Sequence, residues 1–176
     1  MASGRPGSGE YGAFYAGYVN RVGDVDIVST LADQAGALGR LLDRLGAGGA
    51  AHRYAAGKWS VAEVVGHLVD TERIFGMRAT CVARGETAPL PGFDENAYVA
   101  EGRFDLRTID SLRLEFELLR GANVAMFGGL PEDRWRRRGT ASGSPITVRA
   151  LAWIIAGHLD HHLAVLRERY GEAFSD

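Results

Sequence analysis

Four segments of this chain, each about 20 residues long, carry the apolar periodicity of amphipathic helices, which restricts the fold to an all-α architecture. They cover residues 27–45, 60–84, 108–127 and 147–170. In each segment apolar side chains recur every three or four residues, so that they fall on one helix face. The single extended pattern is a short piece near residues 135–138. The sequence therefore predicts an all-α four-helix bundle with long crossover connections.

Residues that favour the start or the end of a helix flank the four segments. Ser60 and Glu63 form the S-x-x-E pattern of a capping box at the start of the second segment. Thr147 stands where it can cap the last one. Each segment is followed by glycine, which ends a helix through its backbone freedom. These stops are the cluster at residues 46–50, Gly85, Gly128 with Gly129, and Gly171.

The segments between the helices differ in character. Residues 86–104 contain prolines, glycines and aromatic residues, which predicts a long irregular connection of the kind that often carries function. Residues 130–145 predict a turn-rich connector with one helical turn at 131–134. Residues 1–22 are rich in glycine and predict a flexible N-terminal tail whose later part, with Tyr15, Tyr18 and Val19, docks. Residues 23–176 are then expected to form one bundle domain.

Composition excludes several classes of protein. The 176 residues carry a net charge of −2, which gives no electrostatic reason to expect nucleic acid or an anionic membrane as a partner. The single cysteine, Cys81, rules out an internal disulfide framework. No apolar run reaches the roughly 18–20 residues of a membrane span, and the N-terminus lacks the apolar core of a signal peptide. We therefore expect a cytoplasmic enzyme or binding protein.

Three histidines interrupt the apolar helix faces. At about 100° per residue, His158 and His162 fall within the apolar stripe of the last helix, one turn apart, and His67 falls on the core-facing side of the second. A buried imidazole without a partner costs about 1–3 kcal/mol. An i, i+4 pair presents two ring nitrogens to one point, as in helical zinc sites. A tri-histidine site leaves positions open for water or substrate, which is the pattern of a catalytic metal.

Two other interpretations compete with a shared metal site. His67 alone fits a buried core residue, and the pair His158 and His162 fits a helix-face or stacking role. His161 lies at the edge of the stripe. It could orient a metal ligand, line the mouth of a pocket, or compete with His162, since i, i+3 is also a workable spacing. The angular argument favours His162 because it points deeper into the stripe. Because three of the five histidines point inward from two helices, a shared partner is favoured.

Polar residues of the 86–104 connection are candidates for a pocket wall. These are Asp94, Glu95, Asn96 and Tyr98. Asp94 fits a turn or cap equally well, and Tyr98 fits packing equally well.

Other polar residues have plainer interpretations. Glu63 is expected to be a cap and Glu72 a surface or salt-bridging carboxylate. Arg73 and Arg78 either pair with acids or contact an anionic substrate, but solvated helix-face charges are favoured. The lone cysteine lies about 21 Å along the helix from His67, too far to share a metal, and is expected to be a small buried residue. The fourth histidine, His52, is expected at the surface.

Three segments carry a resemblance to a known family. They read KWSVAEVVGHLVDTERIFGMR, PGFDENAYV and SPITVRALAWIIAGHLDHHLAVLRERY, and together they span most of the chain between residues 59 and 170. In their order, in the Trp-Ser opening of the second helix and in the closing H-x-x-H-H, the sequence resembles the DinB/YfiT-like superfamily of metalloenzymes, close to its DinB_2 branch.

This resemblance implies a four-helix bundle that holds one divalent metal through three histidines, which map onto His67, His158 and His162. Nickel or zinc is implied first, and iron or manganese second. Family members form homodimers, and characterised relatives are transferases and isomerases that use mycothiol, bacillithiol or glutathione as a metal-activated thiol. We therefore expect a metal-dependent thiol S-transferase, isomerase or hydrolase that acts on a small molecule. The alternatives are a non-catalytic bundle that binds a metal or small molecule for stability or sensing, and an interaction module without metal.

Overall fold

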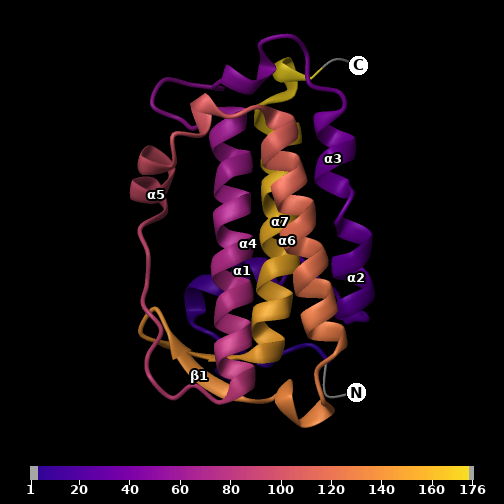
Figure 1. Cartoon of the computed structure of the whole chain (residues 1–176), viewed down its shortest axis with the longest axis vertical. Coiled ribbons are helices and arrows are strands. Elements are labelled where there is room, and N and C mark those ends of the chain that lie inside the picture. The colour runs from indigo at the N-terminus through magenta and orange to yellow at the C-terminus, as the bar shows by residue number, and fades with distance from the viewer. Residues whose placement is uncertain (1–3, 175–176) are drawn as a thin grey trace.

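A computed structural model describes residues 4–174 and confirms the helical bundle (Figure 1). The first bundle position is occupied by two short helices stacked end to end, α2 (Ile27–Gln34) and α3 (Ala37–Leu42). The other three positions are occupied by α4 (Val61–Arg84), α6 (Ile109–Gly128) and α7 (Val148–Arg169). No helix in the described part of the chain is long and apolar enough to cross a membrane.

The helix directions confirm the predicted crossover. The Tyr170 hydroxyl donates to the carbonyl of Trp59 at 2.8 Å, which places the end of α7 beside the start of α4. An ion pair between Arg113 and Asp43 places the start of α6 at that same end, next to the end of α3. Thus α4 and α6 run in the same direction, while α2, α3 and α7 run in the opposite one (Figure 1). The chain between α4 and α6 must therefore return along the length of the bundle.

The first helix was expected to be continuous over residues 27–45, and the structure corrects this. It breaks at Ala35 and Gly36, and the helical part ends at Leu42. Glycine lowers helix stability by roughly 1 kcal/mol relative to alanine, so Gly36 is a natural break point. The periodic leucines continue across the break and therefore gave no sign of it.

The connection at residues 86–104 is also more ordered than expected, because it contains α5 (Glu95–Gly102) on the outer side of α4 (Figure 1). The Asp94 carboxylate accepts hydrogen bonds from the backbone N–H groups of Asn96 and Ala97 at 2.9 and 3.1 Å. Asp94 is therefore a helix cap, one of the two roles its sequence position allowed.

A two-stranded hairpin connects α6 to α7 at the end of the bundle where α4 ends and α7 begins (Figure 1). β1 (Arg138–Ala141) pairs antiparallel with β2 (Ser144–Thr147), and Arg138 lies opposite Thr147. The turn residues Ser142 and Gly143 both have positive φ, 50° and 72°, as short hairpin turns require. The sequence predicted only an extended piece near 135–138, so the hairpin was missed. The helical turn expected nearby is present as η5 (Glu132–Arg134).

The described part of the predicted tail lies along α7. It forms η1 (Ser8–Glu10), η2 (Ala13–Tyr15) and α1 (Ala16–Val19), and Tyr15 and Val19 are buried. A Cβ atom at Gly157 of α7 would lie 2.0 Å from the carbonyl oxygen of Tyr18, so only glycine allows this close approach. Residues 1–3 of the expected flexible tail lie outside the described residues.

Two apolar clusters fill the bundle, one on each side of a polar layer. One contains Phe127 and Trp153, and the other contains Leu112 and Phe116. Between them, Arg120 of α6 donates to both carboxylate oxygens of Glu72 on α4, at 2.8 and 2.9 Å, with both side chains buried. Glu72 is therefore a salt-bridging carboxylate and not a surface one.

The same polar layer reaches the remaining bundle helices. Arg120 also donates to the Gln34 side chain at 3.0 Å, and the amide group of Gln34 donates to Asp160 of α7 at 2.7 Å. Asn123 donates to Glu72 at 2.8 Å. A single hydrogen-bonded network thus connects α2, α4, α6 and α7 through the core.

A second ion pair fastens the N-terminal segment to α7. Glu10 is buried and accepts hydrogen bonds from Arg149 and from the Thr147 hydroxyl, the latter at 2.9 Å. Burial by itself raises the pKa of this carboxyl group, but the hydrogen bonds from Arg149, Gly7 and Thr147 outweigh it and lower the pKa to about 2. The ionised form therefore stabilises the folded state.

We predict that Arg120→Ala lowers the free energy of unfolding by about 3–5 kcal/mol, because it leaves the buried Glu72 carboxylate without its partner. Arg113→Ala on the same helix removes more exposed ion pairs, with Asp43 and Glu117, and should cost only about 1 kcal/mol. Urea unfolding monitored by circular dichroism measures both changes. Equal losses in the two variants would contradict the importance of the buried pair.

We also predict a pH-dependent effect of Glu10→Gln. Because the folded-state pKa lies below the unfolded one, the ionised carboxylate contributes stability above about pH 4.5 that is lost as the pH falls toward 2. The stability difference between wild type and variant, on the order of 2–3 kcal/mol at pH 7, should shrink by about half between pH 5 and 3. Parallel urea titrations at several pH values provide the measurement. A difference that stays constant over this range would refute the assignment.

Candidate metal centre

The three histidines selected from the sequence lie together in the core. His67 comes from α4, and His158 and His162 come from α7. One ring nitrogen of each lies within 4.8 Å of those of the other two, and the Nε2 atoms of His67 and His158 are 3.1 Å apart. All three side chains are buried, with exposures of 3, 5 and 9 %. Their convergence is observed, while their role as metal ligands stays a prediction.

Local helix geometry explains why these residues meet. His158 and His162 are one turn apart on α7, so their rings point from the same face, with centroids 4.6 Å apart. The predicted capping box sets the residue at which α4 begins, since Ser60 and Glu63 each bind the backbone N–H of the other. Since α4 and α7 pack against one another, His67 lies opposite the pair.

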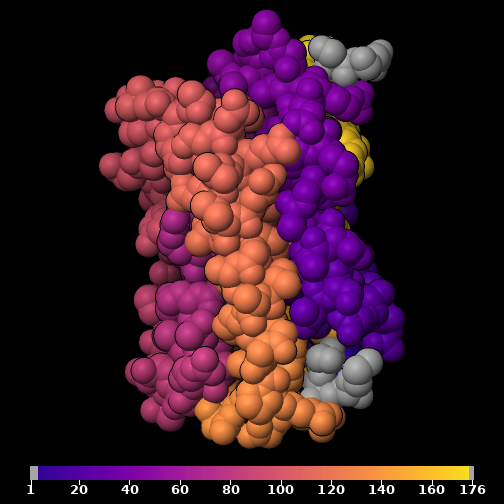
Figure 2. Space-filling model, turned by 45° about the vertical axis from the view of Figure 1, so that its right-hand side comes forward, coloured from indigo at the N-terminus to yellow at the C-terminus, as the bar shows by residue number. Residues whose placement is uncertain are grey.

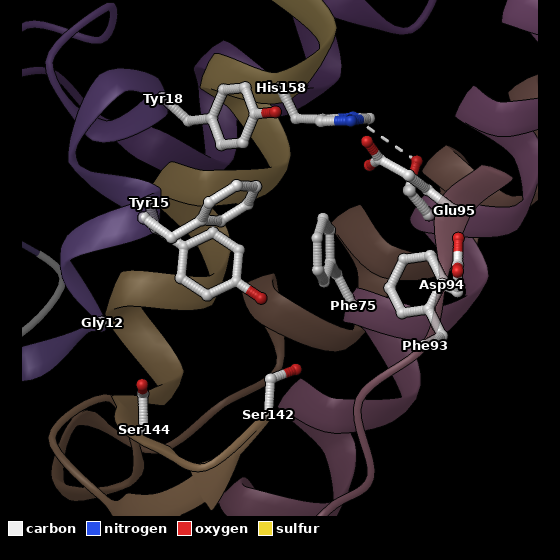
Figure 3. Close-up of a pocket in the computed structure, with 12 residues that line it drawn as sticks. Gly12, Tyr15, Tyr18, Phe75, Phe93, Asp94, Glu95, Ser142, Ser144 and His158 are labelled. Atoms are coloured by element: carbon white, nitrogen blue, oxygen red, sulfur yellow. Dashed lines mark hydrogen bonds between the residues drawn. The ribbon is translucent and has the colours of Figure 1, made fainter.

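Neighbouring side chains restrict the orientation of the rings. The Thr71 hydroxyl donates to the carbonyl of His67 at 2.8 Å and lies 3.4 Å from Nδ1 of His158. Trp59 packs on the ring of His67, and Tyr18 and Phe75 contact that of His158 edge-on (Figure 3). The sequence argument did not place Trp59, Tyr18 or Phe75 beside the histidines, because this proximity arises from tertiary packing.

All three imidazoles are held in the neutral form. Burial lowers the pKa of His67 to about 4 and that of His162 to about 2, with smaller effects from neighbouring histidines. Burial and the adjacent His162 and His67 also hold the pKa of His158 well below its usual range. At neutral pH each ring therefore keeps a nitrogen lone pair, which is the form that binds a metal.

The histidine cluster fits a divalent transition metal. Imidazole nitrogens bind zinc at about 2.0–2.1 Å, so two ligands of one ion lie roughly 3 Å apart, close to the separation of His67 and His158. Nδ1 of His162 is buried and has no hydrogen-bond partner among the described residues. No cysteine or carboxylate of the described residues joins the cluster. Three protein ligands with open positions are the donor set of a catalytic metal site.

His161 lies outside the cluster. It is half-buried, and its ring contacts Tyr18 and His162 with centroids 5.6 and 5.0 Å away. The angular preference for His162 over His161 agrees with this arrangement. His161 lines a cavity next to His162, which corresponds to the role at a pocket mouth that the sequence left open.

Two cavities adjoin the histidine cluster. The first, of about 380 Å³, includes His158 in its wall, and the second, of about 310 Å³, includes His162. The start of α5 contributes to both, because Asp94 and Glu95 line the first and Asn96 lines the second. Tyr98 instead packs on Phe93 and is 48 % exposed. Three of the four candidates from the 86–104 connection thus line a cavity.

Arg73 and Arg78 of α4 were interpreted alike from the sequence, but they have different environments in the structure. Arg73 is exposed and pairs with Glu115, in agreement with a surface charge. Arg78 is 1 % exposed and lies in the core, so the favoured interpretation as a solvated helix-face charge is wrong for it. The helical periodicity of α4 continues without a break past Arg78. It therefore gives no sign that the hairpin and the connection to α5 cover this part of the helix.

Two further expectations need adjustment. Cys81 is only partly buried and lies 3.6 Å from the sulfur of Met77, so it is not a fully buried small residue. His52 is half-buried and contacts the ring of Tyr170, so it is not a free surface residue.

Comparison with known proteins identifies the family. The model of the DinB superfamily matches residues 30–166. No curated protein matches the chain.

Solved structures share the fold. YfiT from Bacillus subtilis, described as a probable metal-dependent hydrolase with an unusual four-helix bundle topology, superposes with a TM-score of 0.76 at 20 % identity, over 83 % of this chain and 85 % of that one. A DinB-like protein from Bacillus subtilis superposes with a TM-score of 0.58 at 21 % identity, over 83 % and 90 %.

A mycothiol-dependent maleylpyruvate isomerase superposes with a TM-score of 0.64 at 17 % identity, over 78 % of this chain. This chain spans only 58 % of the isomerase chain. With the matching family model and the bundle topology on the same residues, the chain belongs to the DinB superfamily.

Proposed function

We propose that this protein is a metal-dependent enzyme in which His67, His158 and His162 hold one divalent transition metal. The observation that carries the proposal is the convergence of three buried, neutral imidazoles between two cavities. Buried polar rings without such a partner would cost stability, and Nδ1 of His162 has no hydrogen-bond partner in the described part of the chain. The similarity in fold to YfiT, a probable metal-dependent hydrolase, supports the same assignment.

Bound there, a divalent cation would supply Lewis acidity and lower the pKa of a coordinated water or thiol toward neutrality. Nickel and zinc are the metals we expect first, with iron and manganese as alternatives, since imidazole suits all of these ions. The protein contributes neutral ligands, the orientation of His158 beside Thr71, and a cavity with aromatic walls next to His158.

Tyr18 is placed to contribute a hydrogen bond in the first cavity. Its ring contacts His158 and lines the cavity wall. Burial, followed by the nearby Glu95 and Tyr15, raises the pKa of its hydroxyl group. The phenol therefore stays protonated at neutral pH and can donate to a substrate atom beside His158.

For the reaction we propose thiol-dependent group transfer or isomerisation, with a low-molecular-weight thiol as co-substrate. The fold shared with a mycothiol-dependent isomerase supports this class, and the likeness to YfiT supports hydrolysis as the alternative reaction. The two cavities, one lined by His158 and the other by His162, offer separate space for a thiol and for its acceptor. A homodimer stays a prediction from the family resemblance, and a cytoplasmic location stays a prediction from the sequence.

We predict that natively purified protein contains one transition metal per chain and that His158→Ala loses it while keeping its helical content. His161→Ala, which removes a neighbouring histidine outside the cluster, should keep the metal. Elemental analysis by mass spectrometry, together with circular dichroism, measures both properties. Unchanged metal occupancy in His158→Ala would disprove the ligand assignment, and wild-type protein that neither contains nor takes up metal would favour an interaction module.

We further predict thiol-transferase activity in the metal-loaded protein with mycothiol, bacillithiol or glutathione and an electrophilic acceptor. His67→Ala should lower the rate by more than roughly a hundredfold, because metal activation of a nucleophile is worth several kcal/mol. Thiol consumption followed by a colorimetric assay gives the rate. A protein that binds metal but turns over neither thiols nor esters would point to the non-catalytic binding or sensing alternative.

A further inference from the structure

Arg78 of α4 is a buried cation without an acidic partner. Its side chain is 1 % exposed, and no carboxylate among the described residues lies within ion-pair distance of it. Its guanidinium group donates to three neutral oxygens: the Pro91 carbonyl at 2.6 Å, the Ser142 hydroxyl at 3.1 Å and the Tyr15 hydroxyl at 3.4 Å. Its Nε atom is buried and has no hydrogen-bond partner within residues 4–174.

Burial of a charged group without a countercharge destabilises the folded state. An unpaired charge in a protein interior costs several kcal/mol, and removal of one partner from a buried pair is strongly destabilising. The chain itself shows the usual solution at Arg120, which is equally buried but bound by both oxygens of Glu72. The rings of Phe75 and Phe93, each 5.7 Å from the Arg78 guanidinium, add cation–π attraction but no countercharge.

Arg78 does not itself line the first cavity, but two of its three hydrogen-bond acceptors and both of its aromatic neighbours do. Tyr15, Ser142, Phe75 and Phe93 are all part of its wall. In Figure 3 the Tyr15 hydroxyl points toward Ser142 at one end of the cavity, while His158 lies at the other end. Each of these hydroxyls accepts from Arg78 through its oxygen, so its own hydrogen is free to donate into the cavity. This end therefore presents hydroxyl donors backed by a positive charge.

We propose that this end of the first cavity, lined by Tyr15 and Ser142 with the Arg78 guanidinium directly behind their hydroxyl groups, binds the carboxylate of an organic substrate. The apolar body of that substrate packs against Phe75 and Phe93, and its reactive group faces His158. The part about His158 rests on the proposed metal-dependent function, whereas the carboxylate subsite itself does not require a metal. The proposal narrows the substrate to a small apolar or aromatic carboxylic acid.

Two carboxylate side chains, those of Asp94 and Glu95, also line this cavity, and their negative charge opposes the binding of an anion. Asp94 is engaged as the cap of α5, where backbone N–H groups at the helix N-terminus offset its charge. Glu95 lies toward His158 in Figure 3, away from Ser142. Neither carboxylate neutralises Arg78. The competing possibility is that the cavity binds an organic cation near Glu95, between the aromatic rings. The experiment must distinguish binding of a cation from binding of a carboxylate.

The test compares three probes of one shape: 3-phenylpropionate, the neutral 3-phenylpropanamide and the cationic 3-phenylpropylamine. Dissociation constants are measured by calorimetry on the full chain, both after treatment with a chelator and after loading with zinc. We expect the carboxylate to bind roughly tenfold or more tightly than the amide in both forms, because its hydrogen bonds are charge-assisted. The amine should bind most weakly.

Variants separate this role from a structural one. Arg78→Met should abolish the preference for carboxylate over amide, Arg78→Lys should restore part of it, and Arg73→Met on the exposed side of α4 should leave it unchanged. Should Arg78→Met fail to fold, Tyr15→Phe and Ser142→Gly serve instead, since each removes one hydroxyl donor. The positive φ at residue 142 accepts glycine without strain. Each is expected to reduce the preference several-fold.

Several results would overturn the proposal. These are no saturable binding of the carboxylate, equal affinity for the amide, tighter binding of the amine, or a preference that appears only with zinc and survives Arg78→Met. The last result would mean that the probe ligates the metal. His158→Ala distinguishes the two proposals, because it should lose the metal yet retain the carboxylate preference. A protein that binds no metal but discriminates the probes would refute only the proposed metal function.

Discussion

The buried ion pair between Glu72 and Arg120 is the interaction on which the arrangement of the core depends. It joins α4 to α6, and through Gln34 it extends to α2 and to Asp160 on α7. Asp160 lies between His158 and His162 in the sequence, and Glu72 follows His67 by five residues. The network therefore fixes the relative positions of α4 and α7 next to the histidine cluster. An apolar layer would tolerate small sliding of the helices, whereas directional hydrogen bonds at this level do not.

The polar groups of α4 show three ways of placing polar atoms in a helical core. Glu72 is satisfied by a complete ion pair, and Thr71 by the carbonyl of its own helix. Arg78 is satisfied only in part, because its Nε atom has no partner among the described residues, and the hydroxyls of Tyr15 and Ser142 that it contacts line the first cavity. Groups that the fold satisfies hold the structure together, while incompletely satisfied ones mark positions where a ligand can bind.

The sequence predicted the four bundle helices, the caps at Ser60 and Thr147 and the convergence of the histidines, because each follows from helical periodicity or local hydrogen bonding. It missed the break at Gly36, the helix α5 and the hairpin, whose short segments carry too few residues to show a period. The burial of Arg78 was missed for a different reason. It depends on Pro91 and Ser142, which are distant in sequence and reach α4 only in the folded chain.

Short peripheral elements complete the first cavity, and of these the sequence predicted the docking of the N-terminal segment but neither the hairpin nor α5. The hairpin supplies Ser142, the N-terminal segment supplies Tyr15 and Tyr18, and the start of α5 supplies Glu95. The bundle itself contributes the histidines, which are confined to α4 and α7. The histidine cluster thus depends on long helices that the family pattern encodes, whereas the cavity wall depends on short peripheral segments. Because such segments tolerate change without loss of the core, this division allows substrate preference to vary while the histidine cluster is retained.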